Sequence, residues 1–150
     1  MFRRSVKKTE ECILLYVEDD DAAAYLFQTA LRDEGINVQL FRVTDGDQAT
    51  DFVLHTGAYE SAPTPDLVVL DLNLPRKSGF DVLAEIRRSY SLHDLPVVIF
   101  STSTLPCDRN KALDLGADKY LAKAGNLDEF VTAVRSMCKL LPTAPMLITA

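Results

Sequence analysis

The chain has 150 residues, 47% of them hydrophobic and 25% charged, and a formal net charge of −6. That length suits one domain with a full hydrophobic core, and the acidic balance argues against a nucleic-acid-binding surface over the whole domain. The apolar runs are far shorter than the ~20 residues that a membrane-spanning helix needs, so no membrane contact is expected.

The chain begins with a basic segment, residues 1–11, in which four residues are Lys or Arg. No apolar region of signal-peptide length follows it, so we predict a mobile, solvated tail. A second tail is predicted at 142–150, where two prolines oppose continuation of the last helix. Residues 12–141 are therefore the predicted domain.

Five short apolar runs, most of them rich in β-branched, aromatic or leucine residues, predict strands. They lie at 12–17, 38–43, 67–70, 96–100 and 119–122. Longer amphipathic stretches alternate with them and predict helices at 22–35, 47–57, 78–90, 107–116 and 126–141. Gly35 suits the end of the first helix, and Ser78 and Asn126 suit the N-caps of the third and fifth.

This alternation predicts an α/β fold with a doubly wound, five-stranded parallel sheet, because parallel strands need crossover helices. The runs 67–70 and 96–100 are almost wholly apolar, as central strands buried on both faces are. The run 38–43 alternates with polar residues, as an edge strand does. In such a sheet, ligands bind beyond the carboxyl ends of the strands.

Polar residues follow four of these runs where the strands end. In a sheet of order 2-1-3-4-5, strands one, three, four and five are successive neighbours, so their ends lie together. The residues concerned are Glu18 and Asp19 after the first strand, Asp71 and Asn73 after the third, Ser101 after the fourth and Lys123 after the fifth.

Carboxylates gathered in this way repel one another. At ~4 Å two like charges oppose each other by about 4 kcal/mol in a near-surface dielectric of about 20, so either one carboxyl stays protonated or a cation lies among them. Oxygen ligands in an open mouth favour a hard ion such as Mg²⁺. A carboxylate beside Mg²⁺, a lysine and a hydroxyl can form and hold an aspartyl phosphate.

Four motifs then resemble one family in the right order along the chain. "LLYVEDD", "LVVLDLNLPRKSGFDVL", "PVVIFSTS" and "GADKYLAKAG" are similar to the receiver domain of two-component response regulators over roughly residues 12–140. The resemblance implies a flavodoxin-like (βα)₅ fold of strand order 2-1-3-4-5. It also implies that the domain accepts a phosphoryl group from a sensor histidine kinase, with Mg²⁺.

The resemblance assigns the metal and phosphoryl sites by position. Asp71 matches the phosphoacceptor, and Glu18 and Asp19 match the acidic metal-binding pair. The backbone carbonyl of Asn73 would complete the metal ligands supplied by the protein, together with Asp71 itself.

The resemblance also assigns a switch. Ser101 matches the switch hydroxyl, Tyr120 the aromatic residue that rotates with it, and Lys123 the phosphate-binding lysine. Two positions depart from the family pattern. Thr102 is bulkier than the usual Ala or Gly, and Ala124 replaces a proline that is usually cis; the ~2.5–4 kcal/mol cost of a cis non-proline bond favours trans here.

Signalling is expected to proceed by a population shift of this switch. No DNA-binding or catalytic output domain follows in the sequence, so the expected partners are proteins: the histidine kinase and either a second copy of the chain or a downstream protein. The sequence is similar to stand-alone receivers that pair with phytochrome-type kinases. We expect no enzyme in the ordinary sense, although a receiver catalyses its own phosphorylation and dephosphorylation.

Three other interpretations stay open. A phosphatase with an aspartate nucleophile usually has a second acid two residues later, where this chain has Asn73. A pseudo-receiver would bind partners without being phosphorylated, and the intact acids and lysine argue against it. A flavodoxin-like nucleotide binder would need a glycine-rich first loop, which the sequence lacks.

Three cysteines, Cys12, Cys107 and Cys138, are scattered and show no CxxC pairing or metal-ligand spacing. An odd, scattered set is typical of reduced thiols rather than of a disulfide framework. We therefore expect a cytoplasmic protein.

Overall fold

The computed structural model describes residues 11–123 and 125–142. The sheet has five strands, all parallel, in the order β2-β1-β3-β4-β5, which confirms the predicted fold and strand order. Both predicted tails lie almost entirely outside the described residues, and so does Ala124, so the expected trans bond before it stays a prediction.

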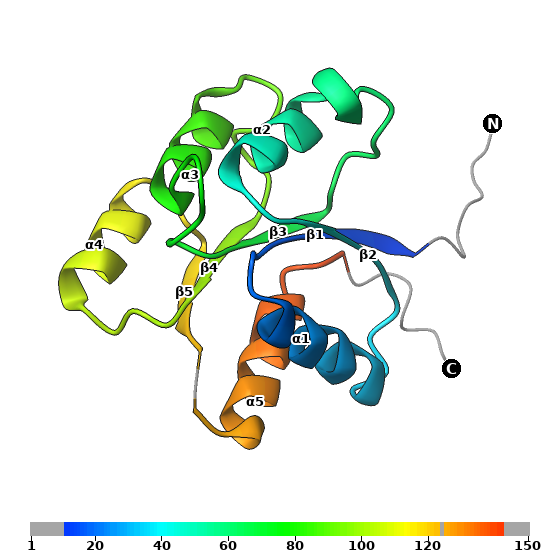
Figure 1. Ribbon diagram of the computed structural model, residues 1–150, viewed down its shortest axis with the longest axis vertical. Helices are drawn as coiled ribbons and strands as arrows, with labels where there is room; N and C mark the ends of the chain where they lie inside the picture. Colours follow the sequence, from blue (N-terminus) through cyan, green and yellow to red (C-terminus); the bar gives the residue numbers. More distant parts are fainter. Residues whose placement is uncertain (1–10, 124, 143–150) are drawn as a thin grey trace.

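The elements alternate strictly along the chain (Figure 1). The strands are β1 (Cys12–Val17), β2 (Val38–Val43), β3 (Leu67–Leu70), β4 (Val97–Ser101) and β5 (Lys119–Ala122). The helices are α1 (Asp21–Asp33), α2 (Gly46–Leu54), α3 (Gly79–Arg88), α4 (Pro106–Asp114) and α5 (Leu127–Cys138), with a short 3₁₀ helix η2 (Gly57–Tyr59). No helix within the described residues is long and apolar enough to cross a bilayer.

Three helix ends are formed by residues that were predicted to cap them. Ser78 and Asn126 accept hydrogen bonds from backbone N–H groups of the first turns of α3 and α5, which satisfies donors that a helix start leaves unpaired. Gly35, just past α1, has a φ of +68°, the left-handed conformation that glycine adopts without steric cost. These local signals were predicted correctly.

The second helix is shorter than predicted. It ends at Leu54 rather than at 57, because His55 takes a left-handed φ of 58° and closes the helix. Residues 57–59 then form η2. Strand β4 is displaced by one residue from the prediction and includes Ser101 as its last residue.

The sheet separates two apolar layers. α1 and α5 cover one face, and α2, α3 and α4 cover the other (Figure 1). β3 and β4 are buried along their whole length, whereas edge strand β2 is only partly buried. Central strands of this kind hold their carboxyl ends in fixed positions, because both of their faces are packed.

The amino-terminal edge of the sheet is held by polar side chains. Arg87 of α3 donates to the carbonyls of Gly116 and Leu95 and pairs with Asp118 at 3.0 Å. The Asp118 carboxylate in turn accepts from the backbone N–H of Val97 at 2.8 Å. This edge therefore carries structural contacts, while the opposite edge carries the residues described next.

Candidate functional site

Three carboxylates meet at the carboxyl edge of the sheet. Val17 and Leu70 are paired across β1 and β3, so the residues that follow, Glu18 and Asp71, lie at the same level. One carboxylate oxygen from each of Glu18, Asp19 and Asp71 lies within 4.8 Å of the others. Glu18 and Asp71 are buried and Asp19 is exposed, so the cluster opens to solvent on one side.

Lys123 brings a positive charge into this cluster from the far side of the sheet. Its backbone N–H donates to the Ser101 carbonyl at 2.8 Å, which continues the pairing of β5 with β4. Its ammonium hydrogen-bonds Glu18 and lies 3.5 Å from Oδ2 of Asp71. One lysine thus contacts the two buried carboxylates, and its long side chain supplies the reach.

Glu18 has two further hydrogen-bond donors besides Lys123. The Tyr16 hydroxyl donates to Oε1 at 3.3 Å, and the Asp20 backbone N–H donates to Oε2 at 3.2 Å. Burial raises the pKa of Glu18 above its usual range, Lys123 acts against this rise, and the charge of Asp71 adds to it. Burial and the neighbouring Glu18 also raise the pKa of the Tyr16 phenol, which keeps it a hydrogen-bond donor.

Arg42, in the edge strand β2, fastens the loop that carries the acidic pair. Its Nε donates to the Glu18 carbonyl at 2.9 Å, and its Nη2 lies 2.9 Å from Oδ1 of Asp21. The sequence reasoning missed both Tyr16 and Arg42. Two signals could have found them: Tyr16 precedes Glu18 by two residues and so shares its strand face, and Arg42 is a cation in an apolar-rich strand next to strand one.

The segment after Asp71 folds back onto the strand end. The backbone N–H of Asn73 approaches Oδ1 of Asp71 at 3.4 Å, and that of Gly79 donates to the Leu72 carbonyl at 3.0 Å. A Cβ at Gly79 would come within 2.2 Å of the Asp71 carbonyl oxygen. Glycine is therefore required where α3 starts against the backbone of Asp71.

The two residues of the expected switch are joined through Ser103. Ser101 is fully buried, and its Oγ accepts from the Ser103 backbone N–H at 3.2 Å. Tyr120 is buried, and its hydroxyl donates to the Ser103 carbonyl at 2.9 Å. Tyr120 thus points inward, and the exposed Thr102 points away from the interior.

The acidic cluster suits a hard divalent cation. The three carboxylate oxygens lie within 4.8 Å of one another, close enough for these side chains to hold one such ion. Carboxylate and carbonyl oxygens are the ligands that such ions prefer. Of the residues predicted for the site, Glu18, Asp19, Asp71 and Lys123 are brought together directly. Asn73 bonds Asp71 and Ser101 bonds Lys123, whereas Tyr120 is connected only to Ser103.

Comparison with known families addresses the identity of this arrangement. The sequence profile of the response regulator receiver domain matches residues 14–135. The chain belongs to the response regulator receiver family.

Relatives of this receiver include single proteins of similar length. It is 38% identical over 125 residues to response regulator Rcp1 of Synechocystis, with 83% of this chain and 85% of Rcp1 covered. It is 35% identical over 126 residues to the probable methanogenesis regulatory protein FilR2 of Methanothrix harundinacea, with 83% and 80% covered.

Solved receivers share the fold closely. The phosphorylated cyanobacterial phytochrome response regulator RcpA superposes with a TM-score of 0.83 at 34% identity, with 93% of this chain and 99% of RcpA covered. The Mn²⁺-bound form of Rcp1 superposes with a TM-score of 0.80 at 35% identity, with 92% and 97% covered. One of these relatives is therefore known phosphorylated and another with a divalent cation bound.

Proposed function

We propose that this receiver accepts a phosphoryl group on Asp71 from a sensor histidine kinase. The observation that carries the proposal is the geometry around Asp71: its carboxylate lies with Glu18 and Asp19 within 4.8 Å and 3.5 Å from the Lys123 ammonium. A nucleophilic carboxylate, a metal-binding pair and a fixed cation are the parts that phosphoryl transfer to aspartate needs.

In the proposed step, a carboxylate oxygen of Asp71 attacks the phosphorus of a phosphohistidine. A new O–P bond forms while the P–N bond to the donor imidazole breaks, and the imidazole nitrogen keeps that electron pair and takes up a proton. Lys123 is placed to neutralise charge on the phosphoryl oxygens. Burial of Asp71 at the end of β3 holds its carboxylate in one orientation.

Glu18, Asp19, Asp71 and the Asn73 carbonyl would hold Mg²⁺. When bound, the ion draws charge from the phosphoryl oxygens of the transition state. The Mn²⁺-bound form of Rcp1 and the oxygen-only ligand set support a divalent cation here, and the preference for Mg²⁺ rests on the hardness of those ligands.

The signal leaves through a switch of the β4–α4 segment. A phosphoryl group at Asp71 adds acceptor oxygens that draw in the Ser101 hydroxyl. Ser101 and Tyr120 both bond Ser103, so the displacement of one changes the surroundings of the other. A protein partner reads the changed surface, and the resemblance to RcpA and Rcp1 favours a phytochrome-type kinase as the phosphoryl donor.

The test is to incubate the metal-free protein with acetyl phosphate, with and without Mg²⁺, and to record intact mass. We expect an adduct of one phosphoryl group that depends on Mg²⁺ and is absent in Asp71→Asn. A matched control is Asp81→Asn, since Asp81 is an exposed acid of α3 outside the cluster; this variant should form the adduct normally.

The other candidate functions predict different results, either in this assay or in a parallel assay of phosphate release. A pseudo-receiver forms no adduct under any Mg²⁺ condition. A phosphatase releases phosphate steadily from many phosphorylated substrates. Either result would replace the proposal.

A further inference from the structure

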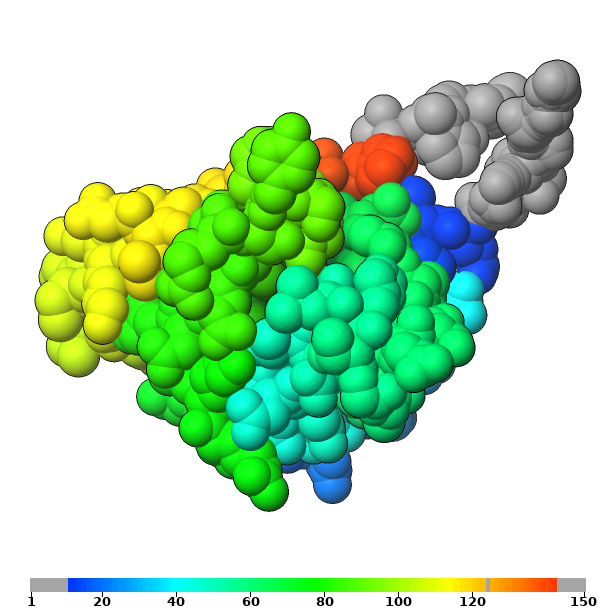
Figure 2. Space-filling view, turned by 90° about the horizontal axis from the view of Figure 1, so that it is seen from above, coloured from blue at the N-terminus to red at the C-terminus, as the bar shows by residue number. Residues whose placement is uncertain are grey.

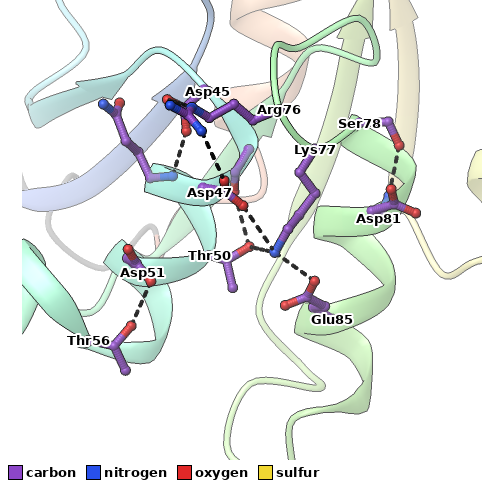
Figure 3. Close-up of polar contacts among 12 residues, drawn as sticks. Asp45, Asp47, Thr50, Asp51, Thr56, Arg76, Lys77, Ser78, Asp81 and Glu85 are labelled. Carbon is purple, nitrogen blue, oxygen red and sulfur yellow. Dashed lines mark hydrogen bonds and ion pairs between the residues drawn. The ribbon is translucent and has the colours of Figure 1, made fainter.

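The loop that follows Asp71 is fastened to two helices by a lysine with no part in the site described so far. Lys77 lies in the segment between β3 and α3, six residues after Asp71. Figure 3 shows its ammonium pointing between α2 and α3, away from its own loop, toward oxygens of both helices. α2 and α3 lie side by side on this face of the molecule (Figure 2).

The ammonium makes two hydrogen bonds and one longer ion pair. It lies 2.8 Å from Oε2 of Glu85 on α3, 3.2 Å from Oγ1 of Thr50 on α2 and 3.7 Å from Oδ1 of Asp47 on α2. Thr50 is buried and its own hydroxyl donates to the Gly46 carbonyl at 3.1 Å. The threonine oxygen therefore faces Lys77 as an acceptor, and the contact is directional.

The backbone around Lys77 is equally constrained. A Cβ at Gly46 would lie 2.2 Å from the Lys77 carbonyl oxygen, so the start of α2 touches the loop directly. The Gly46 N–H donates to the Pro75 carbonyl at 3.3 Å, and so does the Lys77 N–H at 2.7 Å. Arg76 lies between Pro75 and Lys77 and has a left-handed φ of 70°. This strained conformation persists only where surrounding contacts impose it.

Arg76 adds weaker ionic contacts to the same helix. Its guanidinium lies 3.7 Å from Asp45 and 3.9 Å from Asp47. The other end of the loop is held by Gly79 against the Asp71 carbonyl. The short segment that carries Asn73 is thus fixed at both ends, and Lys77 ties it to α2 and to α3.

We propose that Lys77 is a positioning residue of the receiver site: by tying the loop after Asp71 to α2 and α3, it holds the Asn73 carbonyl where a divalent cation binds. The inference rests on the proposed metal site and deepens it. Lys77 does not contact the carboxylates of Glu18, Asp19 or Asp71, so it would act on the metal site through the loop.

The sign of the expected effect separates positioning from electrostatics. Removing a positive charge near an acidic site strengthens cation binding by Coulomb's law alone. Loss of loop order weakens it, because residues that orient metal ligands typically contribute tenfold or more to affinity. Weaker cation binding after removal of Lys77 is therefore evidence for positioning.

The experiment is titration of the metal-free protein with Mn²⁺, followed by the electron paramagnetic resonance signal of the free ion. We expect Lys77→Met to raise the Kd about tenfold, and Arg88→Met to leave it unchanged or lower it slightly. Arg88 is the matched control, since it is an exposed cation on α3. Amide exchange across residues 72–78 should also quicken in Lys77→Met without metal, which a change in charge alone would not cause.

A second variant keeps the test open if Lys77→Met does not fold. Thr50→Val removes one acceptor of Lys77 without changing the net charge, so it should weaken Mn²⁺ binding in the same direction only if Lys77 positions the loop through this contact.

Two outcomes overturn different statements. If the wild type binds Mn²⁺ and both variants bind it equally well or more tightly, Lys77 has no positioning role and the proposed function stands. If the wild type does not bind Mn²⁺, the proposed metal site fails, and the role of Lys77 in it fails as well.

Discussion

Glu18 and Asp71 are buried carboxylates that share one cation, the ammonium of Lys123. Two negative charges at such close range are tolerable only because a positive charge lies between them and hydrogen bonds satisfy their oxygens. The burial of these carboxylates therefore lowers the stability of the folded protein while it holds them in the positions that the proposed reaction needs. Substitutions of single residues at this edge should therefore change the free energy of unfolding.

Lys123→Met removes the shared cation and leaves two buried charges uncompensated. Breaking a buried ion pair from one side typically costs about 3–5 kcal/mol, so we expect a loss of that order in the metal-free protein, measured by urea unfolding. The double variant Lys123→Met/Glu18→Gln should recover part of it. A single-variant loss within the ~0.5 kcal/mol typical of surface changes would contradict the buried pairing.

Gly79→Ala tests the close approach of α3 to the backbone of Asp71. The added methyl group would lie 2.2 Å from the Asp71 carbonyl oxygen and 2.9 Å from the Leu72 Cα, so the backbone of Asp71 has to move. We expect a loss of about 1–3 kcal/mol and slower phosphorylation by acetyl phosphate. Gly125→Ala is the control, because nothing lies within 4 Å of its Cβ position; an equal effect of both changes would rule out the steric explanation.

At the scale of elements, α4 is the helix least secured by its own sequence. Its N-cap, Leu105, provides no side-chain hydrogen bond. Ser103 does so instead: its hydroxyl accepts from the Leu105 N–H at 3.3 Å and donates to Asp108 at 2.6 Å. The start of α4 is thus tied to the same residue that contacts Ser101 and Tyr120.

Ser103→Ala should therefore loosen α4 selectively. We expect a stability loss of about 0.5–2 kcal/mol, as for the loss of a helix cap, with faster amide exchange in residues 106–114. Thr102→Ala alters the exposed neighbouring residue and should change neither quantity measurably. Unchanged exchange in α4 after Ser103→Ala would show that the helix start is held by other contacts.

At the scale of the whole molecule, most of the fold could be predicted because it depends on local patterns. Apolar runs of strand length and amphipathic stretches gave the order of elements, and the parallel sheet brought strand-end residues such as Glu18, Asp71 and Lys123 to one edge. The end of α2 was missed, because the left-handed turn at His55 has no glycine to mark it. Lys77 and Arg42 were missed as well, since their partners come from other elements.

Cys138 provides a thiol that reports on unfolding of the whole domain. Burial raises the pKa of the Cys138 thiol to about 12, so the folded protein keeps the thiol protonated where the unfolded chain ionises it. Its contribution to stability is complete below about pH 9 and is lost as the pH rises toward 12. Stability should therefore fall more steeply across this range in the wild type than in Cys138→Ala.

Alkylation measures the same property at pH 8. In native protein, iodoacetamide should label the exposed Cys107 first. Cys138 is partly buried at the end of α5, so it should react more slowly than Cys107 in native protein and speed up as urea opens the domain. Rapid labelling of Cys138 in native protein, measured in a variant with Cys12→Ser and Cys107→Ser, would show instead that α5 opens independently.

The contacts of Arg87 and Asp118 at the amino-terminal edge have a practical consequence. Because every crossover returns to that edge, the loop after α3 lies at the end of the sheet opposite Asp71, and its Tyr90 is 93% exposed. A fluorophore or an inserted peptide at this loop would not contact the cluster around Asp71. The protein can therefore be attached to a surface through this loop, which leaves the acidic cluster at the other end of the sheet exposed to solvent.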